Sequence, residues 1–421
     1  MPRDRVVTPF RYRREADFTA FRLGRAVLGY LALMMAIITL APFRFALTPQ
    51  HGLTTIWTWQ DLVMNVVMFV PFGFVFQLTR PRGSTVEWRR VLLLGAGVSG
   101  AIEVLQLFSP TRYSSLLDLA TNTAGALLGA ALFARLSRRV RGDVAVQSLA
   151  LELPLMGLVY LLVPLCWLIG LGSEAESRRL LVLAPALIAG AVLGTVHAAY
   201  VAPAHGGTRD VPWLLFTSVG WTIVAIVPGT RGDWWMVVQC LALTISAAML
   251  RGIATRRLLH EGRAGRFELP TLALVLPVYT TYLSLSALWP LTDAGIVFRG
   301  TWALALEGQA LSQPFVYRAL EQVAAFTLVG YMGAEFYGRD PRPLSQTLPR
   351  LVVWTLVASL LLQIARGFHE QHAASGMLFV FTQVTAAFGH WLYLLQRDHI
   401  RALVKRRTLL ESFRRAAGVS P

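Results

Sequence analysis

Three carboxylate side chains lie inside or beside strongly apolar stretches in the first third of the chain: Asp61, Glu103 and Asp118. A carboxylate is costly to place in hydrocarbon, so such side chains usually face a bundle interior, a polar cavity or a partner. Acids held in this way can recognise a polar or charged group, act as a general base, or bind a divalent cation through their oxygens. The three acids are therefore the best guide in the sequence to function.

An amide side chain follows each acid after about one helical turn, at Asn65, Gln106 and Asn122. Residues three or four apart lie on one face of a helix, so each of three helices would present an acid and an amide together. The short loop between the second and third of these helices adds Arg112 and Tyr113. We expect all eight side chains at one level of a bundle, with the acids as catalytic candidates and the others as binding residues.

Structural roles would also account for these residues, and the sequence leaves them open. Asp61 and Asp118 stand near predicted helix starts, where a carboxylate can cap free backbone N–H groups. Glu103 lies among apolar residues and needs a partner, and an ion pair with Arg112 would provide one. The two asparagines could join helices through hydrogen bonds.

The composition is typical of a membrane protein. Of the 421 residues, 55% are hydrophobic and 15% are charged, whereas soluble domains average about 25% charged residues. A net charge of +16 would suggest nucleic acid in a soluble protein. Here the basic residues fall in short loops between apolar stretches, so we expect membrane lipids as partners and no nucleic acid. Cys166 and Cys240 lie in apolar stretches and support neither a disulfide framework nor a metal site.

The predicted fold is all-α: a polytopic bundle of about twelve transmembrane helices, each needing about 20 apolar residues. The expected spans are 23–43, 61–78, 91–108, 117–134, 149–171, 180–202, 211–229, 234–250, 269–289, 315–334, 351–366 and 375–395. With both termini in the cytoplasm, 31 of the 39 Lys and Arg residues fall on the cytoplasmic side, as the positive-inside rule requires. The three acids then lie in the outer leaflet.

This layout divides the chain into five parts. Basic cytoplasmic tails are expected at 1–22 and 396–421, and a four-helix membrane domain at 23–138. The region 149–289 has no polar pattern that we can interpret, and 315–395 is a further transmembrane region.

The region 315–395 has traces of a second, degenerate copy of the first domain. A shift of 260 residues places Gln363 on Glu103 and Arg366 on Gln106, and it places Glu321 on Asp61. Near the end of this region, His369, Glu370 and His372 are interpreted as a solvated loop, because a metal site would need further converging ligands.

Small residues and one proline suggest how the first domain packs. Gly125 and Gly129 form a G-xxx-G pattern that lets another helix approach closely. Pro71 and Gly73 fall in the middle of a span and predict a kink or a thinned helix there. We assign these four residues structural roles.

The two segments DLVMNVVMFVPFGF (61–74) and EVLQLFSPTRYSSLLDLATNTAGALLG (103–129) resemble the VanZ-like family over about residues 24–138. The matching positions are Asp61, Asn65, Phe69, Pro71, Phe72, Gly73, Glu103, Gln106, Arg112, Asp118, Asn122, Gly125 and Gly129. The resemblance implies a protein of the bacterial cytoplasmic membrane, associated with the cell envelope. The family takes its name from a glycopeptide (teicoplanin) resistance protein and has no settled reaction.

Three functions fit these observations. The first is an envelope protein whose outer-leaflet site binds a lipid head group, a lipid-linked wall precursor or an amphiphilic, glycopeptide-type drug, with Arg112 contacting an anionic part. The second is a membrane enzyme that acts on a lipid-linked substrate through the acids or through a divalent cation held by them. The third is a proton-coupled transporter, although its site would be expected nearer the midplane. The first is favoured because no nucleophile or metal motif accompanies the acids, and no cofactor is expected. The oligomeric state is not indicated.

Overall fold

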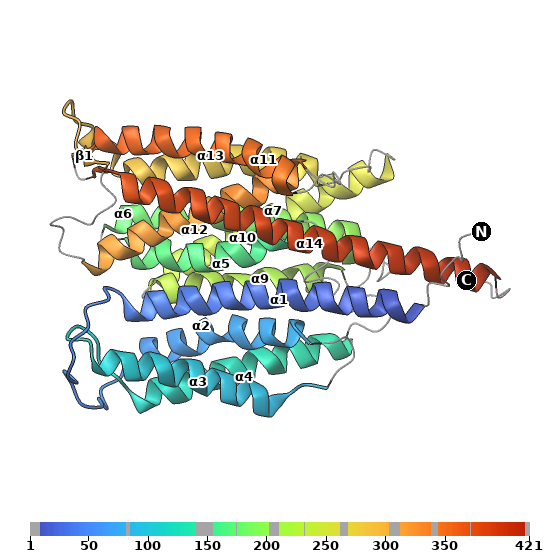
Figure 1. Cartoon of the computed structure of the whole chain (residues 1–421), viewed down its shortest axis with the longest axis horizontal. Coiled ribbons are helices and arrows are strands. Elements are labelled where there is room, and N and C mark those ends of the chain that lie inside the picture. Colours follow the sequence, from blue (N-terminus) through green and yellow to red (C-terminus); the bar gives the residue numbers. More distant parts are fainter. Residues whose placement is uncertain are drawn as a thin grey trace.

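The computed structural model describes residues 9–80, 85–139, 155–173, 175–201, 210–230, 232–261, 268–302, 312–337, 344–370 and 372–416. These residues form a bundle of long helices that run nearly parallel to one another (Figure 1). The α-helices are α1 (Pro9–Leu40), α2 (Trp59–Leu78), α3 (Trp88–Leu107), α4 (Leu116–Arg139), α5 (Met156–Leu171), α6 (Glu176–Arg179), α7 (Leu183–Val196), α9 (Asp210–Thr230), α10 (Trp234–His260), α11 (Leu269–Leu288), α12 (Gln313–Tyr337), α13 (Leu344–Gly367) and α14 (Gly376–Ala416). Two short 3-10 helices, η2 (Leu180–Val182) and η5 (Leu291–Asp293), and a short π-helix, η3 (His197–Val201), lie between them. Strand β1 (Gly300–Thr301) pairs in parallel with β2 (Ala374–Ser375). The predicted all-α fold is confirmed.

Ten helices in the described residues are long and apolar enough to cross a membrane. Each of the twelve predicted spans coincides with a helix, and two of these helices fall outside the ten. Helix α5 has 16 residues in the described part of the chain. Helix α12 has 25 residues but includes Arg318, Glu321 and Glu335 among its apolar side chains. The protein is thus a multi-pass membrane protein.

Helix α1 begins and α14 ends at the same end of the bundle (Figure 1). Both helices extend further than the spans predicted for them, into the sequences interpreted as tails. Thr19 Oγ1 of α1 and His399 Nδ1 of α14 are hydrogen-bonded at 2.9 Å within these extensions. The opposite end, called the loop end here, carries the α1–α2, α3–α4 and α13–α14 connections and the β1–β2 pair. The assignment of this end to the cell exterior stays a prediction.

Close helix contacts through glycine hold the first four helices together. A Cβ atom on Gly73 of α2 would collide with the backbone carbonyl of Ala126 on α4. A Cβ on Gly125 or Gly129 of α4 would collide with backbone carbonyls of α2. The G-xxx-G pattern therefore lies on the face of α4 that packs against α2, where the backbones touch without intervening side chains.

Helices at the edge of the bundle expose apolar side chains. On α3 these include Leu93 and Val104, and on α13 they include Val353, Trp354 and Leu361. Such faces are typical of contact with lipid, because an apolar surface of this kind is unfavourable in water. The core lies around α5, where Leu162, Trp167 and Leu168 are fully buried.

Candidate functional site

Three helices bring the predicted acids together at the loop end. Asn65 of α2 donates a hydrogen bond from Nδ2 to Asp118 Oδ1 of α4 at 2.8 Å. Asp118 is half-buried and lies within electrostatic range of both Asp61 and Glu103. The three carboxylates, called the acid site below, thus share one region between α2, α3 and α4.

Glu103 is buried and holds the start of α4. Its Oε2 atom accepts a hydrogen bond from the backbone N–H of Ser115 at 2.8 Å. Ser115 lies just before α4, and its Oγ in turn accepts the N–H of Leu117 at 3.1 Å. The carboxylate therefore satisfies a backbone donor at a helix N-terminus, where negative charge is favoured.

Asp61 is exposed and caps its own helix. Its Oδ2 accepts hydrogen bonds from the backbone N–H and the hydroxyl of Thr58 at 3.1 and 2.7 Å. Thr58 Oγ1 accepts the backbone N–H of Asp61 at 3.2 Å, which completes a capping box. The capping role that the sequence left open for Asp61 is the one in the structure.

Arg112 does not pair with Glu103, so that alternative is wrong. Its Nε donates to Ala41 O at 3.0 Å, and its Nη2 donates to Ile38 O at 3.3 Å and to the Tyr317 hydroxyl at 2.9 Å. The last carbonyls of a helix have no partner within the helix, and they attract a guanidinium group. Arg112 therefore closes the end of α1 and joins it to α12.

The hydrogen bonds given for the remaining predicted residues go to groups other than the acids. Gln106 Nε2 donates to Thr39 O at 3.1 Å, and Asn122 Nδ2 donates to Ser99 Oγ at 2.9 Å. Among the described residues, the side-chain oxygens of both amides are buried without a hydrogen-bond partner. Tyr113 is exposed, and its ring lies 4.7 Å from that of His51.

None of the three acids forms an ion pair within the described residues. In the same residues, no group of three or more His, Cys, Asp or Glu side chains is placed to hold a metal ion. The charge of the acid site is thus met by an amide and by backbone or hydroxyl donors.

Apolar side chains surround the acid site at the loop end. The α1–α2 connection exposes Leu53, Ile56 and Trp57, and Leu116 is exposed at the start of α4. This connection is tied to the α3–α4 loop by the hydrogen bond from Thr54 N to Ser114 O at 2.9 Å. We call these exposed residues the apolar rim.

An apolar cavity of about 310 Å³ lies between α1, α2 and α4 on one side and α5, α7 and α9 on the other. Its lining includes Pro71, Phe74, Leu136, Tyr160 and Trp221. Volumes of this size are typical of ligand pockets.

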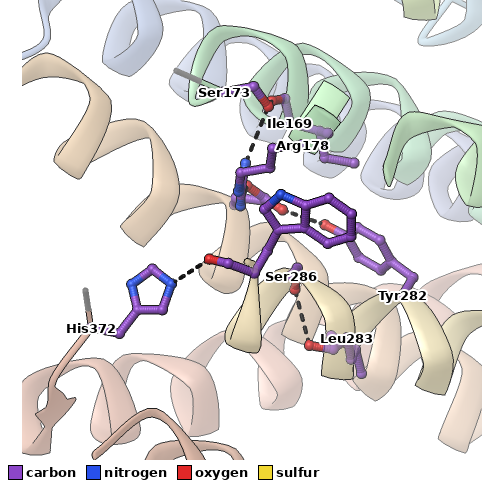
Figure 2. Close-up of polar contacts among 9 residues, drawn as sticks. Ile169, Ser173, Arg178, Tyr282, Leu283, Ser286 and His372 are labelled. Carbon is purple, nitrogen blue, oxygen red and sulfur yellow. Dashed lines mark hydrogen bonds and ion pairs between the residues drawn. The ribbon is translucent and has the colours of Figure 1, made fainter. Parts of the chain in front are cut away.

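A second polar cluster at the loop end was missed in the sequence (Figure 2). Arg178 Nη2 of α6 lies 2.6 Å from Glu321 Oε2 of α12, and the Tyr282 hydroxyl of α11 donates to Glu321 Oε1 at 2.9 Å. Arg178 also donates from Nη1 to Ser173 Oγ at 3.3 Å. The sequence contains one indication of this cluster, because Glu321 is an acid inside a predicted span. Its partner lies in another helix and could not be identified from the sequence.

His369 and His372 are not in a solvated loop, so that interpretation is wrong. His369 is buried, the two rings stack at 4.4 Å, and His372 Nε2 donates to Trp289 O at 2.9 Å. Burial, and then the charge of Arg366, lower the pKa of His372 to about 4. The ring N–H groups of the two histidines thus bind carbonyl groups of the backbone that follows α11.

This pKa predicts a pH dependence of stability. The folded protein keeps His372 neutral down to about pH 4, whereas an unfolded histidine takes up a proton near pH 6.5. The free energy of unfolding should therefore fall as the pH drops from 6.5 towards 4. The variant His372→Gln keeps a hydrogen-bond donor for Trp289 O but cannot take up this proton. We expect its melting temperature to fall less than that of the wild type when the pH is lowered from 7.5 to 5. Equal losses in thermal unfolding of the two proteins would contradict this.

The fold and the acid site define a polytopic helical membrane protein with a carboxylate-containing polar site at one end of its first four helices. Residues 14–138 match the model of the VanZ/LLP1 family, so the first third of the chain is a VanZ-like domain. No curated protein and no solved structure matches the chain.

Proposed function

We propose that this protein binds the cationic head group of an amphiphile at the acid site, in the outer leaflet of a bacterial cytoplasmic membrane. The amphiphile would be a membrane lipid, a lipid-linked wall precursor or a glycopeptide-type drug. The observation that carries the proposal is the group of Asp61, Glu103 and Asp118. Asp118 lies within electrostatic range of both other acids, and none of the three forms an ion pair within the described residues.

The charge of this group favours an ammonium ion. Like charges in a partly buried region are unfavourable, and a cation placed between them relieves the repulsion. Arg112 is held by the carbonyls of Ile38 and Ala41, at the end of α1, and by the hydroxyl of Tyr317. The expected contact between Arg112 and an anionic part of the ligand is therefore not retained in this proposal.

The surroundings of the acid site support an amphiphile over a free amine. The apolar rim lies beside the carboxylates at the loop end. The 310 Å³ cavity, which residues of α2 and α9 help to line, lies deeper in the bundle. Both surfaces could take up hydrocarbon, which gains free energy on leaving water.

The test compares three probes that carry the same dodecyl chain and different head groups: dodecylamine, dodecanol and dodecyl phosphate. Binding to the purified full-length protein in a neutral detergent is measured by calorimetry at pH 7. We expect Glu103→Gln with Asp118→Asn to weaken dodecylamine binding at least about tenfold, which is about 1.4 kcal/mol. Dodecanol binding should not change, and unchanged dodecylamine binding would refute the proposal.

The single variant Glu103→Gln is the control for a folding defect in the double variant. At the corresponding place in the C-terminal helices, Gln363 Oε1 accepts the N–H of Ser375 at 3.0 Å, as Glu103 does for Ser115. A glutamine is therefore expected to keep the start of α4 intact, and a partial loss of amine binding should remain measurable. Turnover of a lipid-linked substrate that disappears in the double variant would instead favour an enzyme, and proton-driven uptake would favour a transporter.

A further inference from the structure

The contact between α12 and α14 repeats the contact between α2 and α4. A Cβ on Gly330 of α12 would collide with the carbonyl of Ala386 on α14, just as Gly73 meets Ala126. Gly389 of α14 packs on backbone atoms of Thr327 and Tyr331, one turn apart, and Gly129 packs in the same way on Val70 and Phe74. The matching residues are 257 apart between α2 and α12, and 260 apart between α4 and α14.

The polar contacts of α13 and α14 repeat those of α3 and α4. Gln363 accepts the N–H of Ser375, as Glu103 accepts that of Ser115, and all these residues correspond at a shift of 260. The pair Ser359–Thr382, at 2.7 Å, corresponds to the pair Ser99–Asn122 at 2.9 Å.

The loop contacts repeat as well. Arg112 donates to Ala41 O just after α1, and His372, 260 residues later, donates to Trp289 O just after α11. These matched contacts in two sets of four helices support a duplication of α1–α4 as α11–α14. The glycine contacts align α12 with α2 at a shift three residues smaller than the one expected from the sequence. Glu321 therefore corresponds to Met64 rather than to Asp61.

The charged residues differ at the corresponding positions. In the C-terminal helices, Asp61 is replaced by Arg318, Gln106 by Arg366, Glu103 by Gln363 and Asp118 by Leu378. The acids of the first site are thus lost, and two arginines are gained.

Arg366 forms no ion pair within the described residues. Its Nε atom is buried and has no hydrogen-bond partner in the part of the chain that the structure describes. The positive charges of Arg178 and Arg318 act on it. Glu321 also acts on it, but both carboxylate oxygens of Glu321 already accept from Arg178 and Tyr282. A partly buried guanidinium whose neighbours include other cations favours an anion as its partner.

An apolar groove begins next to this cluster. The ring of Tyr282, whose hydroxyl binds Glu321, forms part of the wall of a groove of about 470 Å³ between α7, α10 and α11. Leu181, Leu187, Leu243 and Leu285 also line it. A polar cluster at the end of the spans with a hydrocarbon-lined groove beside it suits a lipid, because phosphate groups of a bilayer lie at that level.

We propose that α11–α14 form a second copy of the VanZ-like unit, whose loop-end site binds the phosphate of an anionic lipid through Arg366. This proposal does not depend on amine binding at the acid site. Arginine suits the ligand because its planar fork of N–H donors matches phosphate oxygens.

The test measures dodecyl phosphate and inorganic phosphate binding to the full-length protein in neutral detergent. Arg366→Gln places in α13 the residue that α3 has at this position, and it should weaken dodecyl phosphate binding at least about tenfold. Arg44→Gln removes an exposed arginine elsewhere at the loop end and should have no effect. Equal binding by Arg366→Gln and the wild type would overturn the proposal.

Further measurements separate the outcomes. Arg366→Lys keeps the charge and should retain most of the binding, so a loss as large as that of Arg366→Gln would contradict the charge argument. Inorganic phosphate binding as tightly as dodecyl phosphate would show that the site takes free phosphate and would overturn the lipid assignment. Glu103→Gln with Asp118→Asn should leave dodecyl phosphate binding intact, and Arg366→Gln should leave dodecylamine binding intact, so the two proposals fail separately.

Discussion

Replacing Gly73 with leucine is expected to prevent the protein from folding. Its Cα faces the backbone of Ala126, and a Cβ there would lie closer to the carbonyl group than atoms can approach. Overpacking usually costs about 1–3 kcal/mol when side chains can move. Here the obstacle is helix backbone, so α2 and α4 would have to separate along their whole contact, and we expect a cost above that range.

The matched control is Gly97→Leu on α3, because a Cβ at Gly97 meets no atom within 4 Å. The yield of monodisperse protein and its apparent melting temperature in detergent are the measurements. Gly97→Leu should behave as the wild type, whereas Gly389→Leu, in the corresponding contact of α12 and α14, should fail as Gly73→Leu does. Normal yield and stability of Gly73→Leu would show that the α2–α4 contact is not as close as described.

Removing the carboxylate of Glu321 should have the second-largest effect. Glu321 is 1% exposed and accepts from Arg178, which is 5% exposed, and from Tyr282. Breaking a buried ion pair by removing one partner costs about 3–5 kcal/mol, since the other charge stays buried. We therefore expect Glu321→Ala to lower the melting temperature strongly.

The double variant Arg178→Met with Glu321→Met distinguishes the ion pair from general packing. Replacing both charges by apolar side chains of similar size is often neutral or stabilising. Thermal unfolding should therefore show the double variant closer to the wild type than Glu321→Ala. If the double variant is less stable than Glu321→Ala, the cluster stabilises the fold through interactions other than this ion pair.

Much of the local architecture could be predicted from sequence, because it depends on short-range patterns. Apolar stretches of about 20 residues indicate spanning helices, and helices occur at all twelve expected positions. The one-turn spacing that puts Asn65 below Asp61 also puts it within reach of Asp118, and the two are hydrogen-bonded. The glycines of α4 lie against α2 for the same reason, since residues four apart share a face.

Partner choice between distant segments was decided by the tertiary structure. Arg112 is three residues from Ser115 and looked suited to Glu103, yet it reaches Tyr317, 205 residues away. Arg178 and Glu321, 143 residues apart, had no visible relation in the sequence. The corresponding register of α12 also became clear only from the glycine contacts. Helical periodicity shows which face of a helix is polar. Which carbonyl or carboxylate that face meets depends on how the helices are arranged around it, and this is set by packing over the whole bundle.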